Sequence, residues 1–215
     1  MLALYPEVTP AISSSTWLRK WTKTWDEQDL ENPFKPFPEW PYFDFLSGLF
    51  QKEEMLFVPK SRTVMATWWG VAECLHFVMT HGPATCIFWC PDEDRAVKCI
   101  KYCKVLYEQQ DEELKKIYPP AKPLDQQAVF RFELEDGGWL QALPGKNPDK
   151  IRSEHPTIVM VDVVHHWQST GPRANHETAA FPRYALLCRK WGVTENVAEF
   201  LGRFLLSLMD LATVN

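Results

Sequence analysis

The stretch "MLFVPKSRTVMATWWGVAECL" (Met55–Leu75) indicates how this chain folds. An apolar run, Met55 to Val58, leads into a polar loop, Lys60 to Thr63, and a helical pattern begins at about Val64. A strand that passes through such a loop into a helix suggests phosphate binding, because the free amides at a helix start attract anions. The loop has no glycine, however, and Ala66 stands where phosphate-binding loops usually carry their lysine. The stretch is therefore either a divergent nucleotide loop or simply a strand that turns into a helix.

Strands and helices alternate on the carboxyl side of this stretch. Val64 to Met79 repeats apolar residues at three- and four-residue spacing, which predicts a buried helix. The continuous apolar run Ala84 to Cys90 predicts a strand covered on both faces, and residues 91–109 predict an amphipathic helix with acidic residues at its start. Two short runs around "EDGG" (135–138) predict a hairpin. Thr157 to Asp162 predicts a buried strand that ends in a carboxylate.

This alternation predicts an α/β fold, a three-layer sandwich with a largely parallel central sheet. Ligands of such sheets bind at the carboxyl ends of the strands. The loop after Val58 and the side chain of Asp162 would both lie at such ends. We therefore expect these two parts of the chain to form one site.

The amino-terminal part of the chain is rich in tryptophan and proline. Trp17, Trp21 and Trp25 recur every four residues within residues 14–29, which predicts one helix with an aromatic packing stripe. A second short helix is expected over residues 39–50. These patterns predict an irregular, aromatic-rich entry segment rather than a linker.

Three segments follow from these patterns: an aromatic-rich helical segment over 1–36, an α/β core over 37–163 and a helical tail over 164–215. The tail carries an amphipathic pattern, which indicates core packing or, less readily, a partner-binding face. Its polar interruptions argue against a membrane span. The apolar positions of this pattern are Val197, Phe200, Leu201, Phe204, Leu208 and Leu211.

Composition narrows the class of protein without giving its function. The chain has 215 residues, of which 46% are hydrophobic and 24% charged, as is ordinary for a globular protein. A net charge of −5 gives no polybasic signature for nucleic acid. The first residues do not have the form of a signal peptide, so we expect a cytoplasmic protein in which the six cysteines are free thiols.

The two strand ends offer most of the groups that a nucleoside triphosphate site requires. Such a site needs amides and a lysine for the phosphates, a hydroxyl and a carboxylate for Mg²⁺, and a second carboxylate that orients the attacking water. Lys60, Thr67 and Asp162 can fill the first three roles. The fourth role is not filled, because Asp162 is followed by Val163.

Two other groups of residues have types that could bind a metal ion. Cys86 with Cys90 and Cys99 with Cys103 repeat at four-residue spacing, but a buried strand and a helix face explain both pairs better than zinc does. Asp162 with His165 or His166 is a better candidate for a metal site than the cysteines are. Such a site would suit a metal-dependent hydrolase. Adjacent histidines on an extended chain point to opposite faces, so at most one could join the aspartate. Ser169 and Thr170 lack a nucleophile-elbow pattern.

From Phe37 to Asp162 the sequence resembles the ATPase domain of phage terminase large subunits, the motors that package double-stranded DNA into viral capsids. This fold is P-loop NTPase-like. Several terminases carry their loop lysine at the front of the Walker A motif, as this chain does. The segments that carry the resemblance are "FPEWPYFDFL" (37–46), "VPKSRTVMATWW" (58–69) as Walker A, "ATCIFWCPDEDRAVKCI" (84–100), and "LEDGGWLQALPGKNPDKIRSEHPTIVMVD" (134–162), which leads into Walker B.

The resemblance implies ATP and Mg²⁺ as ligands. It implies that Lys60 contacts the phosphates with help from Arg62, and that Thr67 and Asp162 hold Mg²⁺. The whole implied cofactor-binding set is Lys60, Ser61, Arg62, Thr63, Ala66 and Thr67. The implied partners are double-stranded DNA, the small terminase subunit and the procapsid portal, in the cytoplasm of a bacterial host.

The chain departs from this family at two places. The family has a catalytic glutamate directly after the Walker B aspartate, where this chain has Val163, so we expect no catalytic carboxylate there and poor hydrolysis. After Asp162 the resemblance ends, without a coupling motif or the nuclease domain, as in a truncated terminase. One hypothesis is a frameshift near codon 162. Translating the other reading frames of the gene tests it, and finding family-like text in neither would rule it out.

Overall fold

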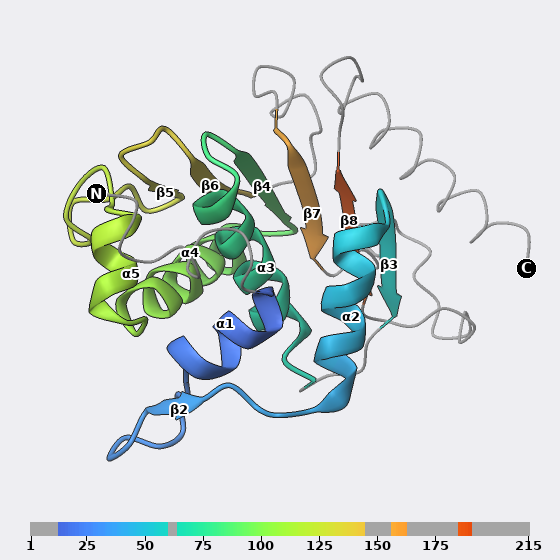
Figure 1. The fold of residues 1–215 in the computed structure, drawn as a ribbon, viewed down its shortest axis with the longest axis horizontal. Helices are drawn as coiled ribbons and strands as arrows, with labels where there is room; N and C mark the ends of the chain where they lie inside the picture. The colour runs from blue at the N-terminus through green and yellow to red at the C-terminus, as the bar shows by residue number, and fades with distance from the viewer. Residues whose placement is uncertain (1–12, 60–63, 145–155, 163–184, 191–215) are drawn as a thin grey trace, which may run out of the picture.

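The computed structural model describes residues 13–59, 64–144, 156–162 and 185–190, and its centre is a six-stranded sheet in the order β3-β8-β7-β4-β6-β5 (Figure 1). β4 pairs in parallel with β6 and with β7, whereas the β3–β8, β8–β7 and β6–β5 pairs are antiparallel. The α/β class is thus confirmed, and the sheet is mixed where we expected a largely parallel one. The strands are β3 (Met55–Pro59), β4 (Thr85–Cys90), β5 (Arg131–Glu133), β6 (Trp139–Pro144), β7 (Ile158–Asp162) and β8 (Ala185–Lys190).

Five helices and a small two-stranded ribbon complete the described part of the chain (Figure 1). α3 and α4 pack on the centre of the sheet, α2 lies against β3, and α1 lies against α2 and α3. The expected helices over 39–50, 64–79 and 91–109 and the hairpin around residues 135–138 are all confirmed. The helices are α1 (Ser14–Trp21), α2 (Pro41–Lys52), α3 (Ala66–Thr80), α4 (Glu93–Glu108) and α5 (Glu112–Ile117), and the ribbon is β1 (Lys23–Trp25) with β2 (Phe34–Pro36).

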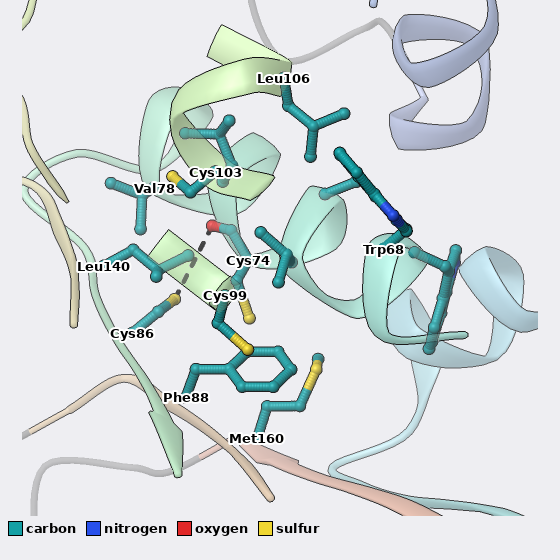
Figure 2. Packing of buried hydrophobic residues seen from close by; sticks show 14 of the residues in the cluster. Trp68, Cys74, Val78, Cys86, Phe88, Cys99, Cys103, Leu106, Leu140 and Met160 are labelled. Atoms are coloured by element: carbon teal, nitrogen blue, oxygen red, sulfur yellow. Dashed lines mark hydrogen bonds between the residues drawn. The ribbon is translucent and has the colours of Figure 1, made fainter. Parts of the chain in front are cut away.

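The core lies between the sheet and the two central helices. Cys86 and Phe88 of β4 face Cys74 of α3 and Cys103 of α4 in this layer (Figure 2). Every residue of β4 from Cys86 to Cys90 is fully buried, which confirms a strand covered on both faces. The continuous apolar run predicted this because a strand with one solvated face would alternate with polar residues.

The tryptophan stripe does not lie on one helix, so this expectation was wrong. α1 ends at Trp21, because Thr22 takes an extended conformation while its hydroxyl donates to the carbonyl of Leu18 at 2.6 Å. Trp25 therefore belongs to β1, and Lys101 of α4 lies over its ring at 3.5 Å from the ring centre. A branched threonine favours the extended chain, and this outweighs the helical spacing of the tryptophans. All three rings still pack on the core.

The hairpin between β5 and β6 turns at a glycine that has a left-handed backbone. Gly137 has φ +88°, and the amide of Leu134 donates to the carbonyl of Gly138 at 2.8 Å. The carboxylate of Asp136 accepts from the amide of Gly138 at 2.8 Å. The turn therefore needs a residue without a Cβ at position 137.

Gly137→Ala is expected to lower the free energy of unfolding by about 1–2 kcal/mol, because an L-residue is strained at this φ. Gly48→Ala is the matched control. Gly48 lies inside α2 with no heavy atom within 4 Å of an added Cβ, so this change should raise stability by up to about 1 kcal/mol. Urea denaturation measures both variants, and equal effects of the same sign would contradict this account of the turn.

Candidate functional site

The start of α3 and the end of β7 meet through a hydroxyl and a carboxylate. The Thr67 hydroxyl donates to the Asp162 carboxylate, and its oxygen lies 3.3 Å from both Oδ1 and Oδ2. Asp162 is only 4% exposed, whereas Thr67 is half-buried. The two residues predicted to hold Mg²⁺ are 95 positions apart in sequence and in contact in the structure. Whether they bind a metal stays a prediction.

The sheet positions Asp162 at the edge of the core. All five residues of β7 are buried, and the strand lies between β4 and β8. Val161 pairs with Trp89 of β4, so the carboxyl ends of these two parallel strands reach the same edge of the sheet. This is the edge at which sheets of this kind place their ligands.

The backbone at the start of α3 has an unusual conformation. Met65, which precedes the helix, is left-handed with φ 51° and ψ 20°, and its carbonyl accepts from the amide of Trp69 at 3.0 Å. This conformation is rare and strained for a bulky residue. Left-handed residues beside helical ones direct successive amides towards one point, as in anion-binding nests. Met65 provides no side-chain cap, so the first amides of α3 lack a capping bond from that position.

A tyrosine of α2 supports this conformation from outside. The Tyr42 hydroxyl donates to the carbonyl of Val64 at 2.6 Å, one residue before the left-handed turn. A tyrosine is protonated at neutral pH and can donate, and burial raises the pKa of Tyr42 further. The chain that enters α3 is thereby fixed to α2.

Several residues expected at this site lie outside the described residues. They are Lys60, Ser61, Arg62 and Thr63 of the loop, together with Val163, His165 and His166 after Asp162. The roles predicted for these residues stay predictions. Ser169, Thr170 and the amphipathic pattern after residue 195 also lie outside the described residues. Ala66 is described and buried as the first residue of α3. Its side chain has no polar atom, so Ala66 can contribute only its amide.

A buried glutamate joins three helices, and the sequence analysis did not predict this. Glu73 of α3 is 2% exposed, and its Oε1 accepts from the hydroxyls of Ser14 in α1, at 2.8 Å, and Ser47 in α2. Trp69 of α3 donates its indole N–H to Ser47 at 3.0 Å. The available signal was a single acidic residue within the apolar run "TWWGVAECLHFVM" (67–79). A carboxyl inside such a run requires buried hydrogen-bond donors.

Five cysteines form a second buried group in which none is in a disulfide: Cys74, Cys86, Cys90, Cys99 and Cys103. Figure 2 labels four of them, Cys74, Cys86, Cys99 and Cys103. The Cys86 thiol lies 3.8 Å from the carbonyl of Cys74. The neighbouring Cys86 and burial raise the pKa of Cys74, and burial raises that of Cys103. Within the described segments, no three cysteine, histidine or acidic side chains are grouped so that they could hold a metal ion.

Comparisons with known proteins add no family assignment. No protein-family model matches this chain, and no curated protein matches it significantly. Among the helices of the described segments, none combines the length and the apolar character needed to cross a bilayer.

Proposed function

We propose that this chain binds Mg²⁺-ATP at the start of α3, as the ATPase domain of a viral DNA-packaging terminase large subunit. The observation that carries the proposal is the contact between Thr67 and Asp162. A hydroxyl and a carboxylate at the start of a helix and the end of a neighbouring strand are the pair that holds Mg²⁺ in P-loop NTPases. The resemblance over residues 37–162 supplies the rest of the proposal.

The donor set fits this metal. Mg²⁺ prefers hard oxygen ligands and binds through one or two protein groups plus phosphates and water. Thr67 offers a hydroxyl oxygen and Asp162 offers two carboxylate oxygens. When bound, Mg²⁺ would neutralise charge on the phosphate oxygens.

The remaining roles belong to the loop and the helix start. The amides that follow Met65, together with the positive end of the α3 dipole, would attract the phosphates. Lys60 supplies the positive charge for the phosphates, and Arg62 assists it. Because Met65 already holds the left-handed turn, the loop needs no glycine there to direct these amides.

Double-stranded DNA, the small terminase subunit and the procapsid portal would be the partners of such a motor. This part of the proposal rests on the resemblance alone. Stimulation of nucleotide turnover by linear double-stranded DNA would support it.

Val163→Glu is expected to raise ATP turnover with little change in nucleotide affinity. The added carboxylate would orient the attacking water, an interaction that acts on the transition state rather than on binding. Phosphate release and fluorescent-nucleotide titration on the same samples measure the two effects separately. Unchanged turnover in a variant that binds ATP would count against the assignment of Asp162 as the Walker B residue.

The proposal as a whole is tested by titrating the purified chain with a fluorescent ATP analogue, in Mg²⁺ and in excess chelator. Saturable binding that requires Mg²⁺ and is lost in Lys60→Ala is the expected result. Binding that is indifferent to both Mg²⁺ and Lys60 would contradict it. Absence of binding would leave a non-catalytic interaction protein with an α/β fold.

A further inference from the structure

Two of the buried cysteines have their sulfur atoms in contact. The Sγ atoms of Cys90 and Cys99 lie 3.6 Å apart, and these residues are 0% and 2% exposed. The proposed nucleotide site uses neither of them. At this distance one thiol can donate to the other.

The local fold brings this pair together over a short stretch of chain. β4 ends at Cys90, and Asp92 then caps α4 by accepting from the amide of Arg95 at 2.9 Å. The helix returns over the strand it has just left, and Cys99 lies on its buried face with Ala96. A strand end and the second turn of the following helix are therefore held together by packing on both sides.

We propose that Cys90 and Cys99 are a redox-responsive pair, which a hydroperoxide converts into a disulfide between β4 and α4. An S–S bond is about 2.05 Å long, so the two sulfurs must approach each other from the 3.6 Å that now separates them. Rotation of the two side chains and a small shift of α4 along the strand end would close this gap.

The reaction takes two electrons from the two thiols. The Cys99 sulfur attacks one peroxide oxygen, the O–O bond breaks, and a sulfenic acid and one water form. The Cys90 sulfur then attacks the sulfenic sulfur, and the hydroxyl leaves with the thiol proton as a second water. Hydrogen peroxide is the oxidant and is reduced to two waters, and an added dithiol reverses the reaction by exchange.

The neighbouring thiols have different surroundings. Cys74 and Cys103 have raised pKa values, for which hydrogen bonding to Cys86 and burial are the first causes respectively. Cys86 is directed at the carbonyl of Cys74. The contact between their two sulfur atoms, at 3.6 Å, is what singles out Cys90 and Cys99.

The proposed disulfide would act on the nucleotide site through the sheet, and this step rests on the proposed function. Trp89 pairs with Val161, so the next residues of the two parallel strands are Cys90 and Asp162. A cross-link that shifts the end of β4 should displace Asp162 relative to Thr67. Oxidation is therefore expected to weaken Mg²⁺-ATP binding several-fold and reversibly.

Peptide mapping of the peroxide-treated full chain tests the pair directly. Cleavage by trypsin and chymotrypsin after Trp89, Arg95, Lys98 and Lys101 isolates "CPDEDR" (90–95) and "CIK" (99–101). The expected product is these two peptides joined, lighter by two hydrogens than their sum and separated by dithiothreitol. Cys90→Ala and Cys99→Ala should each abolish it, whereas Cys103→Ala should not. If other thiols of the chain have been oxidised but these two peptides are recovered separately, the proposal is overturned.

Nucleotide titration of the same oxidised and reduced samples tests the effect on the site. Several-fold weaker binding in the oxidised wild type but not in peroxide-treated Cys90→Ala supports it. The joined peptides with unchanged affinity would overturn the link to Asp162. A reduced chain that binds no nucleotide would instead refute the proposed function, while the peptide map would still decide the disulfide. A thermal melt of each alanine variant shows whether it is folded.

Discussion

Replacing Asp162 by asparagine should lower the affinity for Mg²⁺-ATP on the order of 10- to 100-fold, the range typical of a disturbed metal site. Asparagine keeps the shape of the side chain and an oxygen that can accept from Thr67. It removes the negative charge that attracts Mg²⁺. Fluorescent-nucleotide titration at several Mg²⁺ concentrations measures this loss, which should vanish when the metal is chelated.

Thr67→Val is the companion change, because valine has the shape of threonine without its hydroxyl. It should weaken Mg²⁺-ATP binding to a similar degree. Thr157→Val is the matched control: its hydroxyl accepts from the amide of Thr85 at 3.3 Å, at the amino end of β7 and away from Asp162. If both valine variants bind nucleotide as wild type does, Thr67 is only a structural partner of Asp162 and the proposed metal site fails.

Glu73→Ala is expected to lower the free energy of unfolding by about 3–4 kcal/mol, through a cavity and two hydroxyls left without their acceptor. Those hydroxyls belong to Ser14 and Ser47, which converge on the same oxygen of Glu73. Because they come from α1 and α2, their loss should loosen both helices from α3. Urea denaturation followed by tryptophan fluorescence measures the change.

Two further variants separate the hydrogen bonds from the volume of the side chain. Glu73→Gln keeps Oε1 as an acceptor, so it should lose less than about half as much stability as the alanine variant. Glu108→Ala removes an exposed glutamate of α4 and should stay within about 0.5 kcal/mol of wild type. A loss in Glu73→Gln as large as that in Glu73→Ala would show that the serine bonds are not what stabilises the three helices.

Much of this fold could be predicted from local pattern. β4 and α4 stand out in the sequence because a continuous apolar run and an acid-capped amphipathic helix are each strong signals. The meeting of Thr67 with Asp162 also followed from pattern. Parallel strands place their carboxyl ends at one edge, so an alternation of strands and helices brings such residues together.

Other features are set by contacts between distant parts of the chain. β8 was missed because "ALLCRK" (185–190) is short and ends in charges, and only its pairing with β3 and β7 makes it a strand. The left-handed Met65 has no local signal, since methionine does not favour that conformation. Glu73 could be noticed but not explained, because its donors lie 59 and 26 residues away in sequence.

The position of β8 has a consequence for how the protein is made. In the described sheet β3 is an edge strand whose ladder is formed with β8 alone, and Pro59 pairs with Ala185. On the ribosome the apolar segment "MLFV" (55–58) is synthesised long before its partner. An unpaired apolar strand is a template for other chains. Slow translation or high expression should therefore favour aggregation through this segment. The tendency should fall once residues 185–190 have been synthesised and can pair with β3.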